Sequence, residues 1–97
     1  MNKKSEILKY SNPKIVFQKA RHIFGPHVNI KISTRKNKKY MLYNPTTEKY
    51  IHFGEMLFED YTKHGDNNKR MKFITRNQIW SQNDVYSAGF LSYYLLW

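Results

Sequence analysis

The sequence predicts an α+β fold in which a small three-stranded antiparallel meander packs with three to four helices in a single domain. Three observations predict it. Apolar and polar residues alternate with period 2 in the middle of the chain and lead into a hairpin signal. Helix start signals flank this region on both sides. The 97 residues contain no repeat or linker that would divide them. We expect residues 12–97 to form one compact basic domain, preceded by residues 1–11 as a basic tail or frayed turn.

The first helix is expected over residues 13–23. Asn12 can accept hydrogen bonds from the first free amides, and Pro13 at the first helical position loses no hydrogen bond. Helical spacing then places three apolar residues on one face: Val16, Ala20 and Ile23.

The three strands are expected in the segment that follows. Residues 28–32 alternate β-branched and polar side chains, which is typical of a half-buried strand. Residues 39–43 and 49–53 are β-prone and aromatic, and the turn-forming residues 44–48 separate them. Gly54 is expected to end the third strand.

The second half of the chain predicts further helices. Residues 55–64 are typical of a short helix, and Asp66 is a natural N-cap for a second helix that runs to about Trp80. On that helix we expect Met71, Ile74 and Gln78 to face the core, and Lys69, Lys72 and Arg76 to form an opposite cationic face. Ser87 can cap a last helix whose apolar stripe consists of Phe90, Leu91, Tyr94 and Leu95, followed by Trp97. This stripe should pack across the sheet or against another molecule.

The charge is strongly one-sided. Lys and Arg number 17 against 7 Asp and Glu, which gives a formal net charge of +10. Residues 1–50 hold 12 of these cations and 2 of the acids, whereas residues 51–97 hold 5 of each. Such self-repulsion favours a polyanionic partner, either nucleic acid or an acidic protein surface. The absence of cysteine excludes disulfides, thiolate nucleophiles and cysteine metal sites. No apolar stretch suggests a membrane partner, and a soluble intracellular protein is expected.

Two groups of residues are candidates for nucleic-acid binding. Cations of the basic loop and of the second-half helix can contact phosphates without reading bases. Aromatic residues of the hairpin can stack on bases, although small sheets also use such residues as core. The candidate set is Lys31, Arg35, Lys36, Lys38, Lys39, Lys69, Lys72, Arg76, Tyr40 and Tyr43. A separate set for docking a protein partner is Phe90, Tyr94 and Trp97.

A cluster of histidines and carboxylates provides the one candidate for catalysis. It comprises His52, Glu55, Glu59, Asp60, His64 and Asp66. These residue types suit a divalent metal or an acid and base pair. However, the cluster has no recognised metal-ligand spacing and no nucleophile in a fixed relation to it. We therefore expect structural roles such as capping and ion pairing, with no metal, no cofactor and no enzymatic activity.

The order of these segments resembles a family of small basic proteins from giant nucleocytoplasmic DNA viruses. The resemblance covers roughly residues 12–97 and rests on Asn12-Pro13, Ser33 to Met41, His52-Phe53-Gly54, Glu59 to His64, Asp66, Lys69-Arg70, Arg76, Tyr86-Ser87 and Leu95-Leu96-Trp97. It implies a viral protein located in the virion or in the viral factory of the host cytoplasm. It carries no reaction over to this chain.

Three functions remain open at this stage. The leading one is a non-enzymatic, virion-associated protein that binds nucleic acid through phosphates and helps to package or organise the genome, with DNA favoured over RNA. The alternative is a minor capsid protein or adaptor that docks acidic viral structural proteins through its basic face and aromatic C-terminal segment. A metal-dependent nuclease is the third. The C-terminal stripe could also form the seam of a homodimer.

Overall fold

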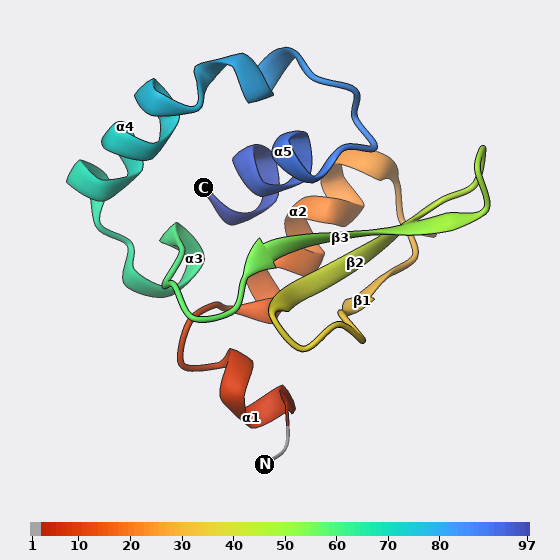
Figure 1. Ribbon diagram of the computed structural model, residues 1–97, viewed down its shortest axis with the longest axis horizontal. Helices are drawn as coiled ribbons and strands as arrows, with labels where there is room; N and C mark the ends of the chain where they lie inside the picture. The colour runs from red at the N-terminus through yellow and green to blue at the C-terminus, as the bar shows by residue number, and fades with distance from the viewer. Residues whose placement is uncertain (1–2) are drawn as a thin grey trace.

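The computed structural model describes residues 3–97 and has the predicted α+β architecture (Figure 1). The first part of the chain comprises α1 (Lys3–Ile7), α2 (Pro13–Phe24), β1 (Ile30–Ile32), β2 (Lys38–Asn44) and β3 (Lys49–Glu55). The second part comprises α3 (Tyr61–His64), α4 (Asn67–Arg76), the 3₁₀ helix η1 (Gln78–Gln82), α5 (Ala88–Leu91) and the π-helical turn η2 (Ser92–Leu96). Within residues 3–97 there are thus five α-helices, whereas three to four were expected. Three of the five, α1, α3 and α5, are each only about one turn long.

The sheet is the predicted antiparallel meander, with strand order β1-β2-β3. Tyr40 of β2 lies opposite Ile32 of β1 and Phe53 of β3. Gly54 does not end β3, which continues to Glu55. Its φ of +84° is unfavourable for any residue with a side chain, and a Cβ atom there would lie 2.9 Å from Leu96 Cδ1. Glycine at this position therefore allows the C-terminal segment to pack closely against the strand.

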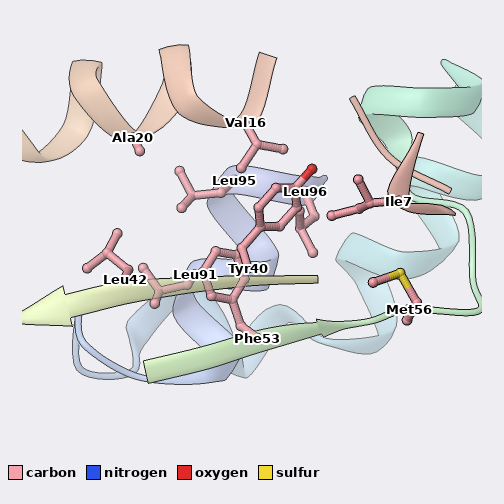
Figure 2. Packing of buried hydrophobic residues seen from close by; sticks show 10 residues of the cluster. All are labelled: Ile7, Val16, Ala20, Tyr40, Leu42, Phe53, Met56, Leu91, Leu95 and Leu96. Carbon is pink, nitrogen blue, oxygen red and sulfur yellow. The ribbon is translucent and has the colours of Figure 1, made fainter. Parts of the chain in front are cut away.

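The core lies between the sheet, α2 and the α5–η2 segment (Figure 2). Figure 2 shows Val16 and Ala20 of α2 directed towards side chains of the sheet and of the last helical segment. The buried apolar cluster consists of Ile7, Val16, Ala20, Tyr40, Leu42, Phe53, Met56, Leu91, Leu95 and Leu96. Each large side chain buried in this way contributes about 1.5–3 kcal/mol through the area removed from water. Leu91 and Leu95 of the C-terminal stripe, together with Leu96, are thus part of the domain's own core.

Several sequence predictions for the helices need correction. Residues 3–7, expected as part of a tail or frayed turn, form α1, and the Ile7 side chain is fully buried in the core. On α2, Ile23 is 41% exposed, because the buried face is centred between Val16 and Phe24 and Ile23 falls at its edge. The helix expected over residues 55–64 is reduced to α3, and Leu57 in the preceding loop is 70% exposed.

The prediction for α4 was right about its start and wrong about its orientation. Asp66 caps the helix by accepting hydrogen bonds from the amides of Asn68 and Lys69, which also lowers the Asp66 pKa. The α-helix ends at Arg76 and the chain continues through η1. No residue of α4 is buried, and Met71, which was expected to face the core, is 59% exposed. Figure 1 shows α4 at the outer edge of the molecule.

No helix within residues 3–97 is both long enough and apolar enough to cross a membrane.

Candidate nucleic-acid interface

A cleft of about 620 Å³ lies between α4 and the body of the domain. One wall is α4 and η1, the opposite wall is the end of β3 with the loop that follows it, and α5 and η2 provide further lining residues. Five aromatic residues line the cleft: Phe53, Phe58, Phe73, Trp80 and Trp97. Its volume falls within the range of about 300–1,000 Å³ typical of small-molecule sites.

Three cations of α4 line this cleft: Lys69, Lys72 and Arg76, here called the α4 cations. They follow one another at intervals of three and four residues, which places them on one side of the helix. The sequence predicted this grouping but not what it faces. None of the three side chains forms an ion pair with a carboxylate within residues 3–97. The α4 wall therefore presents cations that are available to a negatively charged ligand.

Aromatic stacking holds α4 and η1 against the last helical segment. The Phe73 and Trp97 rings are nearly parallel, with centroids 4.4 Å apart and an interplanar angle of 7°. Trp80 meets Phe73 edge-on with centroids 6.0 Å apart. Arg70 Nε donates a hydrogen bond of 2.8 Å to the backbone oxygen of Trp97. A Cβ atom at Gly89 would lie 2.9 Å from Cγ of Trp80, so the missing side chain makes room for the indole.

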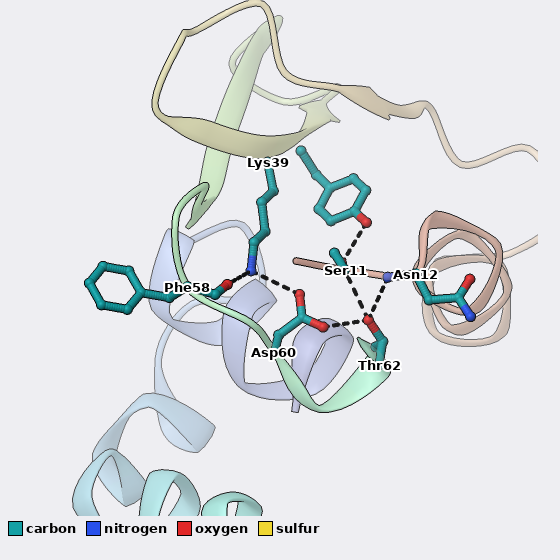
Figure 3. Close-up of polar contacts among 7 residues, drawn as sticks. Ser11, Asn12, Lys39, Phe58, Asp60 and Thr62 are labelled. Carbon is teal, nitrogen blue, oxygen red and sulfur yellow. Dashed lines mark hydrogen bonds and ion pairs between the residues drawn. The ribbon is translucent and has the colours of Figure 1, made fainter. Parts of the chain in front are cut away.

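A buried ion pair fixes the opposite wall. Lys39 and Asp60 are only 2% and 1% exposed, and Lys39 Nζ lies 3.1 Å from Asp60 Oδ2. Lys39 Nζ also donates a hydrogen bond to the backbone oxygen of Phe58 (Figure 3). Burial lowers the pKa of Lys39, an effect that the Asp60 carboxylate opposes. This pair fastens the 56–60 loop to strand β2.

A hydrogen-bonded chain extends from this ion pair towards α2 (Figure 3). The Thr62 hydroxyl donates to Asp60 Oδ1, and Thr62 Oγ1 accepts a bond of 3.0 Å from the amide of Asn12. Ser11 Oγ lies 3.2 Å from Thr62 Oγ1 and accepts a bond of 2.7 Å from the Tyr40 hydroxyl. Burial raises the pKa of Tyr40 well above its ordinary value. The chain joins segments that are far apart in sequence.

The predicted roles of Lys39 and Tyr40 at the surface were wrong. Lys39 was expected to contact phosphates and Tyr40 to stack on bases, yet Tyr40 is fully buried and Lys39 almost so. The reason is that β2 is the central strand and both of its faces are covered between Lys39 and Leu42. For Tyr40, the alternative that hairpin aromatics form core is correct.

The remaining candidates on the sheet lie away from the α4 wall. Arg35 and Lys36 are exposed in the loop between β1 and β2. Lys31 is exposed too, with its Nζ 5.8 Å from the centroid of the Tyr50 ring. Tyr43 is half-buried and meets Tyr50 edge-on, with centroids 5.3 Å apart.

Lys38 differs from these residues because it lines the cleft while forming an ion pair with Glu55, with 2.5 Å between Nζ and Oε1. Apart from the buried Lys39 and Tyr40, the structure thus divides the predicted set into two groups: Lys38 and the α4 cations line the cleft, whereas Lys31, Arg35, Lys36 and Tyr43 lie on β1, the β1–β2 loop and β2 away from it.

The residues proposed for partner docking also separate. Trp97 is half-buried in the cleft against Phe73. Phe90 is half-buried, and its ring lies 4.5 Å from that of Tyr94, which is 38% exposed. The stripe was expected to pack across the sheet or against another molecule, and its buried members Leu91 and Leu95 pack into the core. A docking role for this set stays a prediction, but Trp97 already has an internal partner.

The histidine and carboxylate cluster is dispersed in the fold. His52 Nδ1 lies 2.6 Å from Ser33 Oγ, and burial together with Arg35 and Lys3 lowers the His52 pKa. His64 ends α3 and its Nδ1 accepts a hydrogen bond of 2.9 Å from the amide of Asp66. In the part of the chain that the structure describes, no three histidine or acidic side chains come close enough to hold a metal ion.

Sequence reasoning missed three of the five aromatic residues that line the cleft. Phe58, Phe73 and Trp80 were not singled out, and Glu59 was considered only as part of the acidic cluster. A usable signal was the position of Phe73 between Lys72 and Arg76 on α4. No local pattern could show that Phe58 lies across from this helix, because their proximity depends on the path of the chain between β3 and α4.

Residues 28–77 match the model of a family described as a family of unknown function (DUF5754). The match covers more than half of the 97 residues. The chain belongs to this family. The matched segment runs from just before β1 to the end of α4, and so includes the 56–60 loop and the α4 cations. No curated protein and no solved structure gives a significant match to the chain. The family description names no activity.

Proposed function

We propose that this protein is a non-enzymatic nucleic-acid-binding protein that holds a polynucleotide in the α4 cleft through its phosphates. The single observation that supports this most strongly is the lining of one cleft by three cations without carboxylate partners and by four aromatic residues that are at least partly exposed: Phe58, Phe73, Trp80 and Trp97. Cations that follow a backbone, together with aromatic surfaces, are the combination that proteins use for single-stranded nucleic acids without strong sequence preference. The resemblance to viral proteins extends this proposal to genome packaging or organisation in the virion.

The charge distribution in the cleft supports an anionic ligand. Two of its cations are already neutralised, Lys38 by Glu55 and Lys39 by Asp60. The α4 cations and one carboxylate, Glu59, are left among the lining residues. A net positive cleft within a protein of formal charge +10 attracts polyanions from a distance and binds them at short range. We expect binding to be tolerant of sequence, because phosphates carry no sequence information.

The test is a salt series of fluorescence anisotropy titrations with a labelled 12-nucleotide single strand. The variant Lys69→Gln/Lys72→Gln/Arg76→Gln removes the α4 cations. If each contacts one phosphate, the slope of log K against log salt becomes shallower by about 2, since single strands give about 0.7 per contact. Affinity at low salt should fall accordingly.

A second triple variant, Lys9→Gln/Lys14→Gln/Arg21→Gln, is the matched control. It removes the same charge from exposed positions that do not line the cleft. The proposal requires that this control keep most of the slope and affinity. Equal losses in the two variants would mean that net charge alone attracts the oligonucleotide. Absence of binding by the unmodified protein at low salt would refute the proposed function altogether.

A further inference from the structure

Phe58 is an exposed aromatic residue on a backbone that is held in place. Its side chain is 70% exposed and lines the cleft, and its ring has no aromatic partner within residues 3–97. Figure 3 shows the ring directed away from the polar network that fixes the backbone of the same residue. A single exposed apolar side chain is common on protein surfaces, but this ring lines the same cleft as Phe73 and Trp80.

The loop that carries Phe58 is fixed at both ends as well as in the middle. The amide of Met56 donates a bond of 3.1 Å to the backbone oxygen of Asn37, and the Met56 side chain is buried. The amide of Asp60 donates a bond of 3.0 Å to the backbone oxygen of Tyr10. Between these points Lys39 Nζ donates to the backbone oxygen of Phe58. A ring on such a loop is preorganised for contact, which reduces the entropy lost on binding.

Glu59, the next residue, adds hydrogen-bond acceptors to the same wall. It is exposed, lines the cleft and has no ion-pair partner in residues 3–97. Its carboxylate repels phosphates, whereas the α4 cations on the opposite wall attract them. A bound strand would therefore lie with its backbone along α4 and its bases towards Phe58 and Glu59.

We infer that Phe58 and Glu59 form a site for an unpaired base that carries an exocyclic amino group, as cytosine, adenine and guanine do and thymine does not. This inference rests on the proposed function and specifies its ligand. The Phe58 ring offers a stacking surface that is usable only when a base is not paired within a duplex. The Glu59 carboxylate can only accept hydrogen bonds, so it can pair with the amino groups of cytosine and adenine. Thymine has no amino group, and its one donor, the ring N3–H, lies between two carbonyl oxygens that repel a carboxylate, so it would be disfavoured.

The experiment compares labelled 12-nucleotide strands of deoxycytidine, deoxyadenosine and deoxythymidine with a duplex of the same length, all at one ionic strength. Phe58→Ala should weaken binding of the cytidine strand at least about fivefold, as alanine substitution of stacking residues does. Leu57→Ala is the matched control, because Leu57 is also 70% exposed but does not line the cleft. This control should change affinity less than about twofold.

The selectivity contributed by Glu59 is measured as a ratio of affinities, which a uniform change of charge leaves nearly constant. We expect the unmodified protein to bind the cytidine strand several-fold more tightly than the thymidine strand, and Glu59→Gln to bring this ratio close to one, since an amide can donate as well as accept. Glu48→Gln removes the same charge from an exposed hairpin turn and should leave the ratio unchanged.

The results separate this inference from the proposed function. If the α4 triple variant loses affinity while Phe58→Ala does not, and duplex binds as well as single strand, the base site is refuted and phosphate binding stands. A cytidine to thymidine ratio near one in the unmodified protein overturns the role of Glu59. If neither the triple variant nor Phe58→Ala alters binding, both proposals are wrong.

Discussion

The replacement Lys39→Met tests the buried ion pair on which the cleft wall depends. The substitution keeps a side chain of similar length and removes the ammonium group. The Asp60 carboxylate, 1% exposed, is then left with the Thr62 hydroxyl as its side-chain partner, and the backbone oxygen of Phe58 loses the Lys39 donor. Removing one member of a buried pair costs about 3–5 kcal/mol, because the remaining charge stays buried without compensation.

The expected loss of stability in Lys39→Met is large for a domain of this size. A small domain has a free energy of unfolding of about 5–15 kcal/mol, so the loss removes a substantial fraction of it. At about 4–8 °C per kcal/mol for domains of 60–100 residues, the melting temperature should fall by at least about 12 °C. Urea unfolding at pH 7, followed by circular dichroism, gives the free energy directly.

Two further variants establish the cause of that loss. Lys38→Met removes the neighbouring lysine, whose ion pair with Glu55 is solvent-exposed, with side-chain exposures of 30% and 59%. This control should cost less than about 1 kcal/mol. Lys39→Met/Asp60→Asn removes both charges and should be more stable than Lys39→Met alone. The reasoning fails if the two single variants lose the same stability, or if the double variant recovers none of it.

Two other predictions concern Tyr40 and Gly89. Tyr40→Phe removes the hydrogen bond of 2.7 Å to Ser11 and should cost about 1 kcal/mol at pH 7. Burial raises the Tyr40 pKa, so above pH 10 the unfolded state loses the phenolic proton first, and the unmodified protein loses about 1.4 kcal/mol per pH unit relative to Tyr40→Phe. The deficit of the variant should therefore shrink between pH 9 and pH 11 in urea unfolding, and a constant deficit would contradict the argument. Gly89→Ala places a Cβ atom 2.9 Å from Cγ of Trp80 and should displace the indole towards solvent. In a Trp97→Phe background the tryptophan emission then reports Trp80 alone and should shift to longer wavelength relative to Trp97→Phe itself. Unchanged emission would mean that the helix moves instead.

The sequence alone was sufficient for features that depend on neighbouring residues. The alternation over residues 28–32 and the turn residues 44–48 predicted the meander, because side-chain periodicity and turn chemistry are local properties of the chain. Asn12, Asp66 and Ser87 were recognised as caps, and each accepts hydrogen bonds from the first free amides of its helix. The grouping of the α4 cations followed from helical spacing alone.

Only the tertiary structure decided which of these residues are buried and what they face. The sequence marks Lys39 as part of a basic run, yet it is buried because Asp60, 21 residues later, returns to the same strand. The α4 cations face a cleft because Phe73 stacks on Trp97, a contact between residues 24 positions apart. Local patterns determine which conformation each segment prefers. The free energy that fixes their arrangement comes from contacts between distant segments, which no pattern of neighbouring residues contains.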